Sequence, residues 1–334
     1  MADRHALMLL DSASLYFRAF YGVPDSVKAP DGTPVNAVRG LLDMIARLVT
    51  DHRPDRLVAC WDEDWRPAFR VAAIPSYKAH RAVGGAEAAA AASSDGVAVA
   101  EEVPDALAPQ VPVIAEVLAA LGIARAGAEG YEADDVIGTL TAREVARPAG
   151  ERSPVLVVTG DRDLFQLVDD EAPVRVLYTI RGIKDIEVVD AARLREKYAV
   201  ASGSAYADMA VLRGDPSDGL PGVAGIGEKT AAAMLAKYDD LPGLLAARDA
   251  GDRGLTATQR QRLVAADDYL AVAPGVVRVA ADAPVRLADG APPAGPDAFA
   301  LPREPVDGAA LVDLTARWGL ESSVRRVLTA LADR

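Results

Sequence analysis

Residues 154–163 read Pro154-Val155-Leu156-Val157-Val158-Thr159-Gly160-Asp161-Arg162-Asp163, an apolar run that ends in a pair of aspartates. A run of this length between polar residues predicts a buried strand of a parallel sheet. Two further runs have the same form, because residues 6–10 lead into Asp11 and residues 56–61 lead into Asp62. These three runs decide the fold class.

Helical periodicity separates the three runs, over residues 35–50, 107–121 and 131–145. Alternation of strands and helices predicts an α/β fold with a doubly wound, mostly parallel sheet. Such sheets bind ligands beyond the carboxyl ends of their strands, where all three aspartates fall. Aspartate is also a common turn residue, which is the simpler interpretation for any one of them. Three together favour a site.

Composition excludes several classes of protein. The chain has 334 residues, and its single cysteine, Cys60, excludes an internal disulfide and a cysteine-based zinc cluster. Three histidines are too few for a histidine-rich metal site. We find no apolar run long enough to span a membrane and no signal peptide, so we expect a cytoplasmic protein without a membrane partner. The formal charge of −13 by itself argues against nucleic acid as a partner.

The rest of the chain divides by composition. Residues 83–103 are rich in Ala, Gly and Ser and predict a surface loop or a poorly ordered helix. From about residue 201 the pattern changes to short helices with Gly-rich turns, which predicts a smaller helical unit. Residues 280–305 have the composition of a linker. Residues 308–331 have the apolar spacing of helices that pack on the body.

Acidic residues cluster at three more places, in the segments 130–135, 160–164 and 214–219. With the first two strand ends they give nine carboxylates: Asp11, Asp62, Glu132, Asp134, Asp135, Asp161, Asp163, Asp215 and Asp218. Oxygen ligands without His or Cys select Mg²⁺ or Mn²⁺ over zinc. Two such ions suit in-line displacement at phosphorus. Removing these nine negative charges changes the formal charge from −13 to −4, which no longer opposes a nucleic-acid partner.

These motifs resemble the 5′-nuclease family, which includes flap endonucleases and the N-terminal nuclease domain of bacterial DNA polymerase I. The segments that carry the resemblance are 10–18, 61–62, 69–70, 77–81, 130–135, 159–164 and 214–231. The resemblance implies a PIN-like sheet, a helical arch and a helix-hairpin-helix unit in a stand-alone nuclease. It places an α/β core at 1–200 with the arch at about 75–110, the helix-hairpin-helix unit at 201–280, and a linker with C-terminal helices at 281–334.

The resemblance also implies which carboxylates hold metal. The first cluster would be Asp11, Asp62, Glu132 and Asp134, and the second Asp161, Asp163 and Asp218, with Asp134 near both. Asp135 and Asp215 match positions that act partly through water. All nine positions are filled, which favours activity. Two departures stand out: Gly219 replaces the usual Asn, and the 83–103 insertion falls in the arch.

Three basic residues, Lys78, Arg81 and Arg70, match the family's catalytic basic positions. A nuclease needs cations that face the scissile phosphate, although a solvated basic helix face would look the same in sequence. Tyr77 would stack on a displaced base or pack in the core. Arg18 would contact a phosphate or form an ion pair, and His80 would lie on the surface or contact a phosphate.

Residues 222–231 have the form of a helix-hairpin-helix turn. Gly225 and Gly227 permit close approach of a DNA backbone, and Lys229 and Thr230 flank the helix start whose N–H groups can face a phosphate. Such a contact is independent of base sequence. The resemblance implies a potassium ion held here by main-chain carbonyls, although a Gly-rich turn alone is usually only a turn.

We therefore expect a monomeric 5′-3′ exonuclease and 5′-flap endonuclease that acts on branched, flapped or nicked DNA, or on an RNA–DNA hybrid, in replication and repair. One alternative is a PIN-like ribonuclease, against which the helix-hairpin-helix unit argues. The other is a DNA-binding scaffold without activity, for which Asp161→Ala would leave all function intact.

Overall fold

Seven strands form one sheet in the computed structural model, which describes residues 6–87, 100–180 and 182–334. The strands are β1 (Leu7–Asp11), β2 (Arg56–Cys60), β3 (Ala124–Gly127), β4 (Val155–Thr159), β5 (Val174–Tyr178), β6 (Glu187–Val189) and β7 (Arg286–Leu287). Their order across the sheet is β6-β5-β4-β1-β2-β3-β7. The five central strands are parallel, and the two edge strands, β6 and β7, are antiparallel to their neighbours.

The three apolar runs form the three adjacent central strands, as predicted. β1 lies between β2 and β4, with Asp11 opposite Cys60 and Leu10 opposite Val158. Each of these strands is buried along its whole length, because helices cover both faces of the sheet. Leu9 packs in the core on one face and Leu10 in the core on the other, as the two-residue period of a strand requires. The doubly wound, mostly parallel sheet is confirmed.

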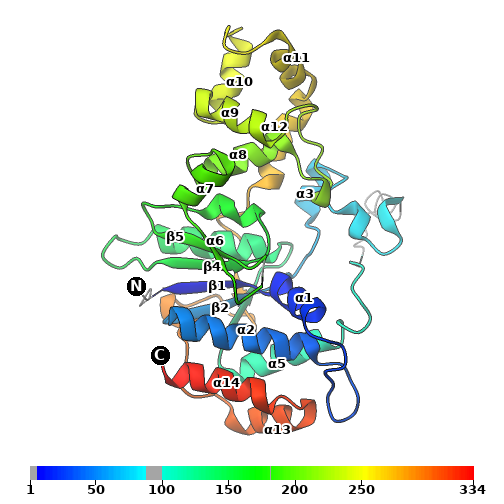
Figure 1. The fold of residues 1–334 in the computed structure, drawn as a ribbon, viewed down its shortest axis with the longest axis vertical. Coiled ribbons are helices and arrows are strands. Elements are labelled where there is room, and N and C mark those ends of the chain that lie inside the picture. Colours follow the sequence, from blue (N-terminus) through cyan, green and yellow to red (C-terminus); the bar gives the residue numbers. More distant parts are fainter. Residues whose placement is uncertain (1–5, 88–99, 181) are drawn as a thin grey trace.

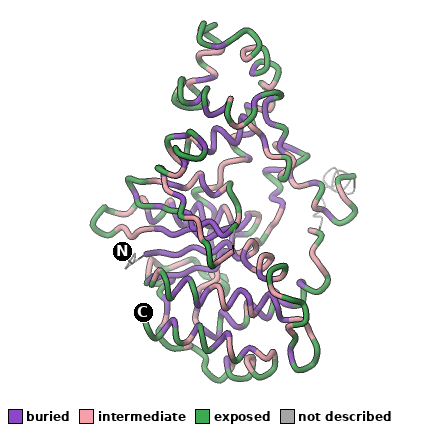
Figure 2. Tube along the Cα trace, viewed as in Figure 1, coloured by how far each residue is buried: buried purple, intermediate pink, exposed green. Residues whose placement is uncertain are grey.

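Helices form a layer on each face and a separate group beyond one of them (Figure 1). The layer on one face contains α1 (Ser12–Gly22), α2 (Asn36–His52), α5 (Gln110–Leu121), α13 (Gly308–Trp318) and α14 (Glu321–Ala332). The other face carries α6 (Ala133–Val145) and α7 (Ala191–Tyr198). Beyond them stand α8 (Gly203–Arg213), α9 (Glu228–Tyr238), α10 (Leu241–Asp249), α11 (Ala257–Ala265) and α12 (Asp267–Val277). Figure 2 shows the buried trace concentrated in the sheet and the helices next to it.

The segment 280–305, expected to be a linker, contributes to the sheet. β7 pairs with β3 and so becomes the edge strand on that side. Phe299 and Leu301 are buried, and the Leu301 N–H donates to the Asp55 carbonyl at 2.9 Å. The Pro-rich composition of this segment predicts a linker, and an edge strand of two residues is too short to show the alternation of a strand in the sequence. The two helices after it, α13 and α14, pack on the body as predicted, α14 against α2.

The arch falls partly on residues 88–99, which lie outside the described residues. The two described ends of this segment are joined by hydrogen bonds: Val83 N–H donates to the Ala100 carbonyl at 3.0 Å and Glu102 N–H to the Arg81 carbonyl at 2.9 Å. α3 (Ala68–Ala73) precedes it. None of the described helices is both long and apolar enough to cross a membrane.

Candidate active site

The carboxyl ends of β1, β2 and β4 form one acidic edge of the sheet. Asp11 is the last residue of β1, Asp62 follows β2 and Asp161 follows β4. Since these strands are adjacent and parallel, their ends meet. The three aspartates line a common cavity of about 330 Å³, together with Glu132 and Asp134 at the start of α6. Five of the nine predicted carboxylates thus face one space.

Asp11 lies at the centre of this edge and is almost fully buried. Its carboxylate accepts a hydrogen bond from the Thr159 hydroxyl at 2.6 Å and caps α1 by accepting one from the Ser14 N–H at 3.1 Å. Burial raises the pKa of Asp11 to about 7, and the charges of Asp62 and Asp161 add to this rise. The fold therefore holds Asp11 where its ionised form is costly unless a cation is near.

Asp62 and Asp134 stand in a similar environment. The Asp62 carboxylate accepts a hydrogen bond from the Ala133 N–H at 2.8 Å, which links the end of β2 to the start of α6. Burial raises the pKa of Asp62. Burial, followed by the charges of Asp11 and Asp161, raises the pKa of Asp134 well above its usual value. Carboxylates that crowd one another in this way are suited to hard divalent cations.

Glu132 receives three hydrogen bonds from the segment 70–78. The Arg70 guanidinium and the Tyr77 hydroxyl each donate to its Oε2 at 2.6 Å, and the Lys78 ammonium pairs with its Oε1. Burial opposes the charged form of Lys78, but Glu132 beside it raises the pKa of Lys78 well above its usual value. Lys78 therefore remains a cation on the wall of the cavity.

Arg70 and Asp135 lie inside the protein and not at the cavity. Arg70 is 2% exposed, and its guanidinium also donates to both oxygens of Asp135 at 2.7 Å. Asp135 is fully buried and accepts further bonds from the N–H groups of Glu132 and Ala280. The Arg70 Nε donates to the Val276 carbonyl at 3.0 Å, and Arg70 is not among the residues that line the cavity. The prediction that Arg70 faces the scissile phosphate is therefore corrected, because its guanidinium is buried and bound to protein groups away from the cavity. The pair positions Glu132 at the start of α6.

Tyr77 is corrected in the same way. Its ring is 4% exposed and belongs to the core, and its hydroxyl is bound to Glu132. It is not available to stack on a base, so the core alternative holds. Arg18 donates to the Ile180 carbonyl at 3.2 Å beside the acidic edge, and His80 is exposed on the 3-10 turn Ala79–Arg81.

The second predicted cluster continues from Asp161. Asp163 lies two residues further and donates its N–H to the Asp161 carboxylate at 2.8 Å. Burial, and then the charges of Asp161 and Asp218, raise the pKa of Asp163 well above its usual value. Asp218 is paired with Arg81 at 2.6 Å. Asp215 caps the 3-10 turn Pro216–Asp218 by accepting the Ser217 N–H at 2.8 Å.

The turn at 215–219 is fastened to the basic segment 76–81. The Lys78 N–H donates to the Asp218 carbonyl at 2.9 Å, and Lys78 itself has a left-handed backbone with φ 47°. A non-glycine residue in this region is strained by about 1–3 kcal/mol, so surrounding contacts must hold it. Gly219 has φ +72°, and a Cβ there would lie 2.1 Å from the Ser76 carbonyl oxygen. This explains why glycine stands at a position where relatives are expected to have Asn.

The carboxylates share the edge without forming a closed metal centre. Within the described ranges no three acidic, histidine or cysteine side chains have the spacing of a formed metal site. Lys78 and Arg81 pair with Glu132 and Asp218, so side-chain cations balance part of the charge. The donor set nevertheless fits hard cations, because buried carboxylates with raised pKa values gain most from a divalent neighbour.

The helix-hairpin-helix turn lies at the start of α9. Gly225, Gly227 and Lys229 are exposed there, Thr230 is half-buried, and Gly227 leaves the first N–H groups of α9 without a side-chain cap. The Gly225 carbonyl accepts a hydrogen bond from the Arg262 guanidinium at 2.9 Å. The turn thus already holds one internal cation at a main-chain carbonyl.

Sequence reasoning missed two residues at the cavity. Thr159 holds the Asp11 carboxylate, and its position just before Gly160-Asp161 was the available signal. Glu101 lines the cavity together with Lys78 and Arg81. Burial raises the pKa of Glu101. No sequence signal marks Glu101, because it ends the low-complexity segment and reaches the site only through the pairing of Ala82 with Glu101.

Comparison with known proteins assigns both parts of the chain to one family. Residues 6–199 match the model described as 5′-3′ exonuclease, N-terminal resolvase-like domain. Residues 201–294 match the model described as 5′-3′ exonuclease, C-terminal SAM fold.

Relatives along the whole chain carry the same description. A 5′-3′ exonuclease of Streptomyces coelicolor is 63% identical over 97% of this chain and 99% of the relative. One of Mycobacterium tuberculosis is 50% identical over 98% of each chain. DNA polymerase I of Mycobacterium bovis is 42% identical over 72% of this chain, which corresponds to 24% of the polymerase.

Solved structures share the fold at low identity. The T5 D15 protein, co-crystallised with metal ions, has a TM-score of 0.59 at 18% identity and covers 98% of this chain and 99% of its own. The catalytic core of Rad2 in complex with DNA substrate has a TM-score of 0.55 at 16% identity, covering 98% of this chain and 93% of its own. By the matches of both family models and of its full-length relatives, the chain belongs to the 5′-3′ exonuclease family.

Proposed function

We propose that this chain is a divalent-metal-dependent 5′-3′ exonuclease and 5′-flap endonuclease that hydrolyses DNA phosphodiesters in replication and repair, including primer and flap removal. The observation that carries the proposal is the convergence of five carboxylates on one cavity whose wall also holds Lys78 and Arg81. The relatives named 5′-3′ exonuclease support the same activity.

Residues of the open edge would hold the metal. We assign Asp11, Asp62, Glu132 and Asp134 to one ion and Asp161, Asp163 and Asp218 to a second, with Asp134 near both. Mg²⁺ or Mn²⁺ fits these oxygen donors. Bound there, the ions would lower the pKa of a water and offset charge on the attacking and leaving oxygens. Asp135 and Asp215 support the site as positioning residues, because their oxygens are bound to Arg70 and to the 216–218 turn.

The chain's own cations act on the phosphate. Lys78 and Arg81 line the cavity from one segment, so both can face a phosphate placed at the carboxylates. Their present partners, Glu132 and Asp218, are assigned metal ligands. A metal that takes these carboxylates would leave the two cations free to stabilise negative charge on the phosphate.

The second unit would hold the duplex. The uncapped N–H groups at the start of α9, with Lys229 and Thr230 beside them, suit a backbone phosphate. We assign residues 1–200 to the nuclease core with an arch at about 75–110, 201–280 to duplex binding, and 281–334 to the C-terminal segment. We further propose a monomer in the cytoplasm, acting on branched, flapped or nicked DNA and on RNA–DNA hybrids, with K⁺ at the helix-hairpin-helix turn.

A labelled-substrate assay tests the proposal. Wild type with Mg²⁺ or Mn²⁺ should cut a 5′-flap duplex and leave single-stranded RNA of matched sequence uncut, and EDTA should abolish cleavage. Asp134→Asn should be inactive, whereas Asp313→Asn, an exposed carboxylate on α13, should cut like wild type. Preferential cleavage of the RNA would favour the ribonuclease alternative, and no cleavage of any substrate would favour the scaffold.

A further inference from the structure

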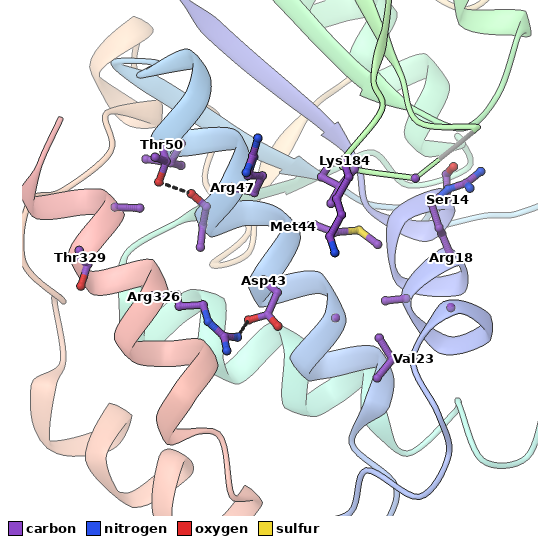
Figure 3. Close-up of a pocket in the computed structure, with 18 of the residues that line it drawn as sticks. Ser14, Arg18, Val23, Asp43, Met44, Arg47, Thr50, Lys184, Arg326 and Thr329 are labelled. Carbon is purple, nitrogen blue, oxygen red and sulfur yellow. Dashed lines mark hydrogen bonds and ion pairs between the residues drawn. The ribbon is translucent and has the colours of Figure 1, made fainter.

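A second and larger cavity is bounded on one side by α1 (Figure 3). Its volume is about 1600 Å³, and it is bounded by α1, α2, α14 and the segment that follows β5. Its α2 lining includes Gly40, Met44, Arg47 and Thr50, which recur at helical spacing. One face of this 17-residue helix therefore forms the floor of an open groove, and such a helix is about 25 Å long.

The groove is basic in a chain that is acidic overall. Seven basic and two acidic side chains line it among the described residues, whereas the whole chain carries a formal charge of −13. Arg47 and Arg326 pair with Asp51 and Asp43. Three other cations, Arg53, Lys184 and Arg325, are exposed and form no ion pair with any residue that the structure describes. This surplus of positive charge is available to an anionic ligand.

Apolar and aromatic side chains line the same groove as these cations. Phe17 and Met44 line the groove, and Tyr21 and Ile180 at its margin are 72% and 49% exposed. Contiguous exposed apolar side chains mark binding surfaces, and these four line one groove. Cations beside aromatic side chains are typical of sites for single-stranded nucleic acid. The cations attract its phosphates, and its unpaired bases stack on the aromatic rings.

The groove is continuous with the acidic edge. Ser14 and Phe17, in the first turns of α1, line both cavities. Next to them Arg18 bridges to the Ile180 carbonyl at 3.2 Å. The helices α8–α12 lie beyond the opposite face of the sheet (Figure 1). A strand that leaves a duplex on α8–α12 and crosses the carboxylates therefore continues towards this groove.

We propose that the groove between α1, α2 and α14 binds the single-stranded 5′ arm of the substrate, on the 5′ side of the phosphate held at the carboxylates. This inference rests on the proposed nuclease function and adds a place for the arm. The groove takes DNA by phosphate charge and base stacking, so it is indifferent to base sequence.

Binding measured in EDTA tests the proposal without cleavage. Fluorescence anisotropy compares duplexes with 5′ arms of about 2 and about 12 nucleotides, a range that matches single-strand sites. The longer arm should tighten binding to wild type, and Lys184→Glu together with Arg325→Glu should remove most of that gain. The salt slope should fall by about 0.7 for each phosphate that the variant no longer neutralises. Arg286→Glu, at the exposed opposite sheet edge in β7, is a charge-reversal control away from the groove, to be compared with each single variant, and should keep the gain.

The outcomes separate the groove from the nuclease activity. If Lys184→Glu with Arg325→Glu binds the long-arm duplex as wild type does, the groove assignment is overturned, although cleavage of the short-arm duplex would still support the nuclease. If the variants lose affinity only for a duplex with a 3′ arm, the strand assignment is wrong. If wild type cuts neither duplex with Mg²⁺ or Mn²⁺, the proposed function itself fails.

Discussion

The acidic edge contains two groups of carboxylates that are stabilised differently. The paired carboxylates, Glu132 and Asp135, are bound by Arg70, Tyr77 and Lys78. The open carboxylates are the assigned metal ligands that form no ion pair with a described residue: Asp11, Asp62, Asp134, Asp161 and Asp163. The pKa values of Asp11, Asp134 and Asp163 in the open group are raised by burial.

This difference indicates that the paired carboxylates position the site and the open carboxylates bind the metal. A buried ion pair keeps its members charged and fixed in the folded protein, and removal of one partner is costly. Open carboxylates that repel one another destabilise the fold when ionised, and a bound cation removes that penalty. The paired group thus sets the geometry at the start of α6, and the open group supplies binding capacity.

Neutralising an open carboxylate should have the largest effect on activity. Asp134→Asn removes a carboxylate that is assigned to one metal ion and lies near the second, so we expect flap cleavage to fall by about 10²–10³-fold or more. The same change relieves repulsion from Asp11 and Asp161, so the metal-free protein should unfold at a higher temperature. Cleavage assays with metal measure the expected loss of activity, and thermal melts in EDTA measure the expected rise in unfolding temperature. A variant that is both active and less stable would contradict the division into two groups.

Substituting Arg70, the cation shared by the paired carboxylates, should have its main effect on the free energy of unfolding. Arg70→Met leaves Glu132 and Asp135 buried without their cation, which should lower the free energy of unfolding by about 3–5 kcal/mol. Arg70→Lys keeps the charge but cannot bridge both carboxylates, and should lower metal affinity or activity by about 10–100-fold.

Urea unfolding and metal titration measure the two variants. Arg193→Lys, at an ion pair between partly exposed side chains, is the matched control and should change both quantities little. Full activity of Arg70→Lys with unchanged metal affinity would show that the paired group does not position the site.

Asp11 should make metal binding depend on pH. Because the folded pKa is about 7, against 3.8 for the free group, a divalent ion must displace a proton below pH 7. We expect affinity for Mn²⁺ to fall about tenfold per pH unit below 7, as calorimetry would show.

The stability of the metal-free protein also depends on the protonation of Asp11. Since the folded state keeps a proton that the unfolded chain has lost, the Asp11 contribution to stability declines as pH rises from about 4 to about 7. Asp11→Asn has no titrating group at this position. The stability of the variant relative to wild type should therefore increase as pH rises from about 4 to about 7. A difference between the two proteins that is constant with pH would refute the raised pKa.

The smallest effect concerns the helix-hairpin-helix turn. Arg262 donates to the Gly225 carbonyl and so competes with the proposed K⁺ for one oxygen of the turn. Exchange of K⁺ for Na⁺ should therefore alter duplex affinity of wild type by less than about twofold, or about 0.4 kcal/mol. Arg262→Ala frees this carbonyl and should increase the preference for K⁺. Equilibrium binding in each salt measures this, with Arg253→Ala as an exposed control. A strong K⁺ requirement of wild type would contradict this role for Arg262.

The sequence by itself determined the parallel strands, the helices between them and the line of carboxylates at their ends. It succeeded there because strand and helix periods depend on neighbours only a few residues away, and because adjacent parallel strands end at one edge. The family resemblance added the order of the motifs, and the matches along 6–199 and 201–294 agree with it.

Only the tertiary structure decided which charges meet. Arg70 lies 62 residues from Glu132 and 65 from Asp135 in the sequence, so no local pattern shows that its guanidinium is buried between them. The same holds for Glu101 at the cavity, for β7 in the expected linker, and for the basic groove assembled from both ends of the chain. Contacts of this kind depend on how distant elements pack, and packing is a property of the whole fold and not of any one segment.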